Sequence, residues 1–327
     1  MLTAEKVKQV AKAMGADLVG IGSPDRWEGA PVQMDPRQIM PEAKSVITMA
    51  FRIMRGSLRG IEEGTFFSNY SSMGYGGLNW LYIPYTVINI AKFIEDYGYE
   101  AIPMGHLSPW RGIDNEGNLR PDYSRPVEPG RAAPDVMVHL RIAAFLCGLG
   151  EISYSKVFLT PQFGPRQRFG VMLTDAELDP DPIYDGPHLC DRCMDCVTEC
   201  PGNAIDPDRT VKVTLAGHEV EWNDLDCEAC GMYFRGGEYV EEGEKGDYMA
   251  GRDDIKPGPI SPFYHKPPNV YEYGQAICGA KGCMRACMIH LEERGVIGNK
   301  FHAPFRRKKL WRVDWSVEPD AIAGEGE

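Results

Sequence analysis

The chain has 327 residues, of which 43% are hydrophobic and 25% are charged, as in an ordinary globular protein. Its formal net charge of −12 disfavours a nucleic-acid partner, because such partners are bound mainly through lysine and arginine. The sequence contains no apolar run long enough to span a membrane and no basic-then-apolar signal region at its start. We therefore expect a cytoplasmic protein whose cysteines stay reduced.

The first half of the chain alternates predicted helices with predicted strands. Apolar residues recur at helical spacing in three segments, 3–14, 81–97 and 134–147. Runs of apolar or β-branched residues predict four strands, at 16–21, 45–51, 100–104 and 169–173. Two glycine-rich segments, 56–80 and 105–131, are predicted to be long loops, which either carry function or only make turns. The alternation over 1–180 indicates a layered α/β or α+β domain.

A run of four cysteines follows the last predicted strand. It reads Cys190-x2-Cys193-x2-Cys196-x3-Cys200-Pro, which is the ligand spacing of a ferredoxin-type [4Fe–4S] site. In such runs the fourth cysteine binds the other cluster of a pair, so a second group of cysteines is needed. A single zinc ion would leave most of the cysteines unused, and a chain of this length needs no disulfide framework. The run therefore indicates two iron–sulfur clusters.

Two such clusters need eight thiolates, and the chain has ten cysteines. We assign the first cluster to Cys190, Cys193, Cys196 and Cys287. We assign the second cluster to Cys200, Cys227, Cys278 and Cys283. Cys230 is then spare or replaces Cys227, and Cys147 is most simply a small buried apolar residue. The segment 231–275 is interpreted as an insertion between the two groups of ligands.

Three short motifs stand before the cysteine run: GLGE at 148–151, TPQFGPRQR at 160–168 and LTDAEL at 173–178. In this order, the motifs and the cysteines resemble those of the cobalamin-dependent reductive dehalogenases and of the related epoxyqueuosine reductases. The resemblance implies an α+β fold with a nitroreductase-like α/β cobalamin-binding domain over 1–185. It further implies a ferredoxin-like domain with two [4Fe–4S] clusters over 186–300 and a C-terminal tail over 301–327.

The resemblance also implies a corrinoid cofactor held with its lower base displaced from cobalt. The residues expected to lie against the macrocycle belong to the first two motifs: Gly148, Gly150, Thr160, Phe163 and Gly164. Glycines in such positions let the backbone approach a cofactor closely. Ordinary turns at a helix end and a hairpin would explain the same glycines.

The implied reaction is the reductive removal of halogen from a small organohalide, with electrons from a ferredoxin- or flavodoxin-type donor. In the dehalogenases a tyrosine acts together with a lysine or arginine, and Arg168 matches the position of the basic residue. Tyr123, Tyr154 and His106 are the candidate proton donors. Asp135 lies one residue from the place of the acid in epoxyqueuosine reductases, and a helix first-turn role explains it equally well.

Two other functions remain as alternatives. An epoxyqueuosine-type enzyme would act on tRNA, and the net charge of −12 argues against it. A two-cluster electron carrier would have no use for the first 180 residues, and it would take up iron without a corrinoid. A metal analysis for cobalt and iron separates the electron carrier from the two cobalamin enzymes, and a salt-dependent shift of tRNA on a native gel would favour the epoxyqueuosine-type enzyme.

Overall fold

The computed structural model describes residues 1–66, 69–105, 124–134, 136–234, 237–239, 255–257 and 282–305. His106, Tyr123, Asp135 and Cys278 lie outside the described residues. The mixture of helices and antiparallel strands fits the predicted α+β class. Within the described part of the chain, no helix has the length and apolar character needed to cross a membrane.

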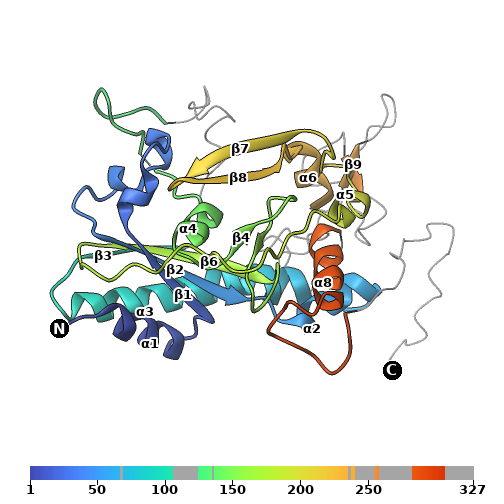
Figure 1. The fold of residues 1–327 in the computed structure, drawn as a ribbon, viewed down its shortest axis with the longest axis horizontal. Helices are drawn as coiled ribbons and strands as arrows, with labels where there is room; N and C mark the ends of the chain where they lie inside the picture. The colour runs from blue at the N-terminus through green and yellow to red at the C-terminus, as the bar shows by residue number, and fades with distance from the viewer. Residues whose placement is uncertain are drawn as a thin grey trace, which may run out of the picture.

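A four-stranded sheet forms the centre of the fold, in the order β1-β2-β6-β3, and every pair in it is antiparallel (Figure 1). Its strands are β1 (Leu18–Gly22), β2 (Ser45–Arg52), β6 (Gln167–Thr174) and β3 (Ala101–Met104). The central strands β2 and β6 pair along their full length, from Ser45 opposite Thr174 to Arg52 opposite Gln167. Both are almost entirely buried, so successive side chains enter two different apolar layers. These strands confirm the four strand predictions to within a few residues.

One layer lies under helices α1 (Ala4–Ala13) and α3 (Ile83–Glu95), which cover the same face of the sheet (Figure 1). Thr3 caps α1 as predicted, since its hydroxyl accepts a hydrogen bond from the Lys6 amide at 3.3 Å. Helix α8 (Cys283–Glu293), which carries two of the predicted ligands, contributes Met288 and Leu291 to this core. The cysteine-bearing end of the chain and the sheet therefore share one apolar core.

The other layer lies between the sheet and helix α4 (Leu140–Leu146), which is shorter than the predicted helix 134–147. The chain before Leu140 is drawn into another contact, because the Met137 amide bonds the Gln33 carbonyl at 2.9 Å. His139 then caps α4, accepting from the Ile142 amide at 3.3 Å. Two hairpins cover this layer: β4 (Glu151–Ile152) with β5 (Phe158–Leu159), and β7 (Thr210–Leu215) with β8 (His218–Asn223).

The prediction of a loop at 56–80 is wrong. Helix α2 (Arg55–Glu63) and a π-helix, η4 (Tyr70–Tyr82), occupy most of this segment. Glycine lowers intrinsic helix propensity, but the burial of Leu58 and Ile61 outweighs that cost in α2. Long π-helices are rare and often lie at functional sites.

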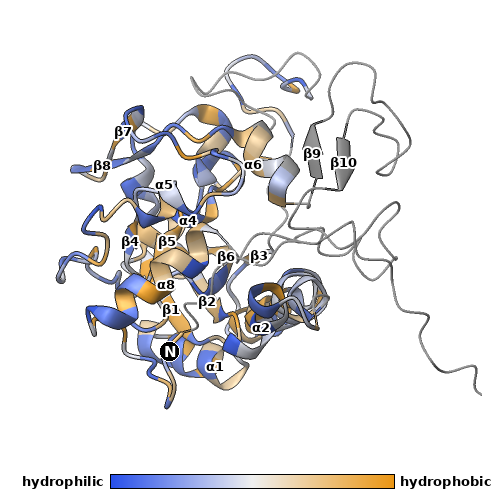
Figure 2. Cartoon of the chain, turned by 90° about the vertical axis from the view of Figure 1, so that its right-hand side faces the viewer, coloured by the Kyte–Doolittle hydropathy of each residue, from blue (hydrophilic) through white to orange (hydrophobic). Residues whose placement is uncertain are grey.

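The helices that carry the cysteines gather at one end of the molecule (Figure 1). They are α5 (Asp195–Thr198), α6 (Cys227–Phe234) and α8, and α5 contacts α8. The remaining short elements are η1 (Pro24–Trp27), η2 (Val32–Met34), η3 (Pro36–Gln38), β9 (Gly237–Tyr239) and β10 (Ile255–Pro257). Figure 2 shows hydrophobic residues concentrated around the central strands and α4, with hydrophilic residues toward the rim.

Candidate functional site

A pocket lies between the start of β6 and the cysteine-bearing helices. The pocket is partly open to solvent. The sheet side is formed by β6, α4 and the turn between β4 and β5, and the opposite side by α6 and the first residues of α8. Apolar side chains make up much of the wall, among them Leu140, Phe169, Ile205, Phe234 and Met284.

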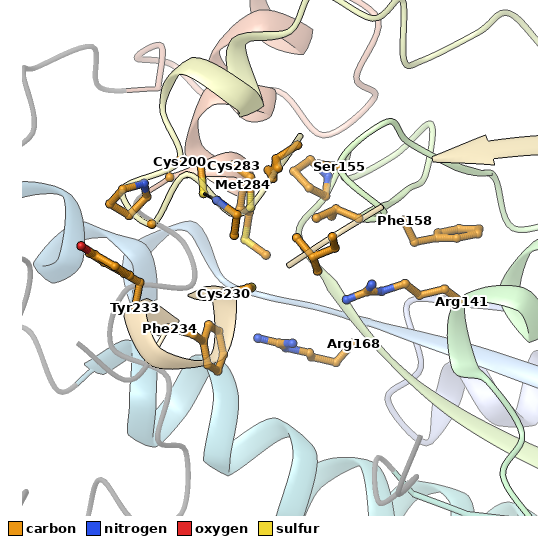
Figure 3. Close-up of a pocket in the computed structure, with 18 of the residues that line it drawn as sticks. Arg141, Ser155, Phe158, Arg168, Cys200, Cys230, Tyr233, Phe234, Cys283 and Met284 are labelled. Carbon is orange, nitrogen blue, oxygen red and sulfur yellow. Dashed lines mark hydrogen bonds between the residues drawn. The ribbon is translucent and has the colours of Figure 1, made fainter. Parts of the chain in front are cut away.

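Two arginines enter this pocket. Arg141 comes from the first turn of α4 and Arg168 from the start of β6, and both guanidinium groups point toward Cys230 and Phe234 (Figure 3). Burial, and then the positive charge of Arg168, lower the pKa of Arg141 from its ordinary value. Even so, an arginine remains charged at any physiological pH. The predicted site residue Arg168 therefore faces the same pocket as Arg141.

Aromatic residues of η4 hold Arg168 in place. Its Nη2 donates a hydrogen bond to the hydroxyl of Tyr70 at 2.7 Å, and its guanidinium lies 4.5 Å from the centre of the Tyr75 ring. Tyr75 in turn contacts Phe234 of α6 edge to face, with ring centres 5.6 Å apart. Tyr70 is fully buried and lines the pocket. The Nε of Arg168 is buried and has no hydrogen-bond partner among the described residues.

Three cysteines line the same pocket: Cys200, Cys230 and Cys283 (Figure 3). Burial, and then the nearby Cys230 and Cys200, raise the pKa of the Cys283 thiol to about 12. The Ala204 amide donates a hydrogen bond to the Cys200 sulfur at 3.3 Å, the kind of contact that tunes cluster potentials. The pocket thus has thiols on one side and guanidinium groups on the other.

The other predicted ligand group is also brought together. Burial and the proximity of Cys190, Cys196 and Cys193 raise the pKa of Cys287 well above its usual value. Left-handed residues stand on either side of Cys193, Arg192 with φ 60° and Met194 with φ 64°. Such conformations turn successive amides inward and make the anion-binding concavities found at iron–sulfur sites. This local curl fits an anionic cluster held by the four thiols.

Helix α6 carries Cys227 and Cys230, and the sequence does not determine which of them binds the second cluster. Cys230 lines the pocket beside Cys283. Cys227, one turn earlier, lies toward Lys156, whose pKa is lowered by burial and by Arg141 while Cys227 opposes that shift.

All nine cysteines of the described residues are free thiols. Cys147 is fully buried behind the sheet, as predicted, with its thiol donating to the Val46 carbonyl at 3.4 Å. Burial raises its pKa to about 12.

Tyr154, a candidate proton donor, does not line this pocket. Its hydroxyl donates to the main-chain carbonyl of Asp206 at 2.7 Å, and its amide bonds the Cys190 sulfur at 3.4 Å. Desolvation, and then the charge of Asp206, raise its pKa. Tyr154 supports the cysteine run in this structure.

The predicted corrinoid-contacting residues are likewise absent from the lining of this pocket. A Cβ on Gly148 would lie 2.2 Å from the Pro182 carbonyl oxygen, and one on Gly150 would lie 2.0 Å from that of Leu159. Thr160 accepts from the Phe163 amide and donates to Gln167, both at 3.1 Å. The remaining member of the set, Gly164, has a φ of 57° and lies near Leu291 of α8. Close packing of the chain explains these residues, and their contact with a corrinoid remains a prediction.

Tyr70 and Arg141, the two polar pocket residues nearest in role to Arg168, were not among the residues predicted from the sequence. Tyr70 lies in the glycine-rich segment that was predicted to be a loop, and no short-range pattern connects it with Arg168. Arg141 offered a signal, since it stands between Leu140 and Ile142 in an otherwise apolar helix, where a charge needs a partner.

No protein-family model matches the chain. A tetrachloroethene reductive dehalogenase of Desulfitobacterium hafniense is 26% identical over 205 residues, covering 58% of this chain and 30% of that protein. That of Sulfurospirillum multivorans is 42% identical over 60 residues, covering 18% of this chain and 12% of that protein. The chain is related to the reductive dehalogenases. It spans 30% of the length of the Desulfitobacterium relative.

A solved structure of a variant of the catabolic reductive dehalogenase NpRdhA is similar in fold to this chain. The TM-score is 0.50 at 22% sequence identity, covering 71% of this chain and 29% of that chain. The match shows a shared fold, while the chemistry must be argued from the pocket itself.

Proposed function

We propose that this protein removes halogen from a small organohalide by the reaction R–X + 2e⁻ + H⁺ → R–H + X⁻. The observation that carries the proposal is the composition of one pocket. A buried tyrosine bonded to an arginine, Tyr70 with Arg168, faces the same space as the thiols of Cys200, Cys230 and Cys283. A candidate proton donor and the proposed ligands of an electron-supplying cluster therefore face the same apolar cavity.

The thiols present fit the two iron–sulfur clusters that such a reaction needs. The first cluster would be held by Cys190, Cys193, Cys196 and Cys287, and the second by Cys200, Cys230, Cys278 and Cys283, with Cys230 preferred over Cys227 because it lines the pocket. No carboxylate is among the described lining residues of the pocket. When bound, cobalamin and the two clusters supply the low-potential electrons that cleave the carbon–halogen bond.

Tyr70 is placed to supply the proton. Its hydroxyl oxygen accepts a hydrogen bond from Arg168, and a phenolic O–H can itself act as a donor. The guanidinium stabilises the phenolate that forms when this proton leaves. As a cation that lines the pocket, Arg168 can also stabilise the departing halide. Proton donation by a positioned side chain typically contributes ~10²–10⁴-fold to a rate.

The walls of the pocket keep this chemistry out of bulk water. Leu140, Phe169 and Phe234 surround the two arginines with apolar surface. In such surroundings, hydrogen bonds to developing charge are stronger than in water. At the other end, Cys193 is exposed, so we propose that a ferredoxin- or flavodoxin-type donor delivers electrons at that face.

The test is anaerobic reconstitution with iron, sulfide and cobalamin, followed by halide release under a titanium(III) reductant. We expect close to eight irons and one cobalt per chain, and halide release that depends on both metals. Iron uptake without cobalt would contradict the proposal and favour the electron carrier. A fully loaded protein that releases no halide from any chloroalkene, halophenol or halobenzoate would also contradict it.

A further inference from the structure

The pocket is positively charged within a strongly acidic protein. Arg141 and Arg168 line it, and none of its described lining residues is an aspartate or glutamate. The whole chain, by contrast, has a formal net charge of −12. Two cations gathered in an apolar cavity focus the field there and favour an anionic ligand.

Arg141 is the group that most needs such a ligand. Arg168 already bonds the Tyr70 hydroxyl and stacks on Tyr75. Among the described residues, by contrast, none forms a hydrogen bond or ion pair with the Arg141 guanidinium. A half-buried guanidinium in an apolar pocket has lost part of its hydration, and a carboxylate or similar group that binds to it offsets that cost.

The neighbours of Arg141 on the described elements add no negative charge apart from the thiols. Lys156, in the turn between β4 and β5, is a third basic group on this side. His139 stays neutral, since burial and then Arg141 and Lys156 lower its pKa to about 3. Both lie close enough for their charges to interact with Arg141.

We infer that Arg141 binds an anionic group of the substrate, so that the preferred organohalide is a halogenated aromatic acid or a halophenolate. The inference rests on the proposed function and names its substrate class. A guanidinium binds a carboxylate through two parallel hydrogen bonds, which orients the substrate as well as holding it. The apolar side chains of Leu140, Phe169 and Phe234 accommodate the ring. An uncharged haloalkene would leave Arg141 without an anionic partner among the described residues.

Two other anions have the chemistry to satisfy Arg141: the phosphodiester of a corrinoid and the thiolates of the second cluster. Each predicts a different loss when Arg141 is replaced. Loss of the corrinoid contact would lower the cobalt content, and loss of the cluster contact would shift a cluster midpoint potential. Loss of the substrate contact would change neither and would weaken only the binding of the anionic ligand.

The probes are 3-chlorobenzoate and 3-chlorobenzamide, which have nearly the same shape and differ in charge. We expect the reconstituted wild-type protein to bind the benzoate at least tenfold more tightly than the amide in calorimetric titrations. Replacement Arg141→Gln should weaken benzoate binding about 10- to 100-fold, as expected for losing a hydrogen bond to a charged group. It should leave binding of the amide within about threefold. The control Arg59→Gln changes an exposed arginine of α2 and should alter neither affinity.

Equal affinity of the wild-type protein for benzoate and amide would overturn the inference without the need for any variant. So would unchanged benzoate binding in Arg141→Gln, or loss of cobalt from that variant. Halide release from 3-chlorobenzamide but not from 3-chlorobenzoate would leave the proposed function standing and remove the inference. Tight, Arg141-dependent benzoate binding without halide release from any substrate would support the anion site and contradict the proposed function.

Discussion

At the scale of single residues, the site depends on a phenol and a guanidinium that are distant in sequence. Tyr70 comes from a π-helix and Arg168 from the central sheet, and their side chains meet at 2.7 Å. The hydrogen bond between them offsets the desolvation free energy that each polar group would otherwise lose in an apolar cavity. This mutual dependence makes both side chains testable by substitutions that keep their shape.

Replacing Tyr70 with Phe removes the hydroxyl and keeps the ring. We predict that halide release falls by about a hundredfold or more, since a positioned proton donor contributes that much or more. Cobalt and iron content should not change, because the ring still fills the wall of the pocket. The control is Tyr85→Phe in α3, where the tyrosine is 68% exposed. Halide release within about threefold of wild type in a fully loaded Tyr70→Phe protein would remove Tyr70 as the proton donor.

Replacing Arg168 with Met keeps much of the apolar stem and removes the charge. Turnover should fall by about a hundredfold or more, comparable to losing one preorganised donor in an active site. The measurement is halide release from a halophenol panel with a chemical reductant, together with metal analysis. Near-normal turnover would rule out the proposed role, and loss of cobalt would show that Arg168 holds the cofactor instead.

At the scale of elements, the position of α4 depends on how closely its end approaches β1. A Cβ on Gly20 would lie 2.1 Å from the main-chain oxygen of Cys147, the residue that ends α4. Only glycine therefore lets β1 and α4 pack at this separation. Arg141 stands at the other end of the same short helix, so this packing also fixes where its guanidinium enters the pocket.

The replacement Gly20→Ala should lower the free energy of unfolding by at least 1–3 kcal/mol, the typical cost of overpacking. Gly56→Ala in α2 is the matched control, since nothing lies within 4 Å of its added methyl group. It should raise the free energy of unfolding by up to about 1 kcal/mol, because alanine favours the helix. Both values come from denaturant titrations. An unfolding free energy for Gly20→Ala equal to that of wild type would contradict the packing argument.

Helix α6 also decides which of its cysteines serves the second cluster. Because Cys230 lines the pocket with Cys200 and Cys283, we predict that Cys230→Ser loses about half of the iron. Cys227→Ser should keep nearly all of it, as should Cys147→Ala. Iron analysis after anaerobic reconstitution checks this. The opposite pattern, with iron lost from Cys227→Ser alone, would restore the original assignment.

At the scale of the whole molecule, the cysteine-bearing end and the sheet are not independent in their packing. Met288 and Leu291 of α8 belong to the same buried cluster as Ile47 and Phe51 of β2. A disturbance at Cys283 or Cys287, which lie on the same helix, is therefore transmitted directly into the core of the sheet.

Removal of the clusters should consequently destabilise the entire chain. We predict that thermal unfolding followed by circular dichroism coincides with loss of cluster absorbance, in a single transition. A chelator that strips the iron should lower the midpoint of that transition, because ligand binding to the folded state contributes to its stability. Two transitions well separated in temperature, one for the clusters and one for the sheet, would show that the two regions unfold independently.

Local sequence patterns were enough to predict the strands of the sheet, two of its helices and the cluster chemistry. Runs of apolar and β-branched residues located the four strands of the sheet, and a hydrophobic period of 3.6 located α1 and α3, because both signals depend on residues close in sequence. The spacing of Cys190, Cys193, Cys196 and Cys200 indicated the cluster chemistry for a similar reason, since three ligands of the first cluster lie close along the chain. Arg168 was found through its place in a motif beside that run.

Tertiary structure alone decided the rest. The helices within 56–80 form despite their glycines, because burial against the sheet outweighs local propensity. The partner of Arg168 is Tyr70, 98 positions away, and no local pattern encodes a contact across that distance. Arg141 reads as part of a helix in the sequence, and it becomes a candidate anion-binding residue only where α4 meets β6 and α6. The pocket is therefore a product of long-range packing, whereas its strands and cysteine ligands are products of short-range pattern.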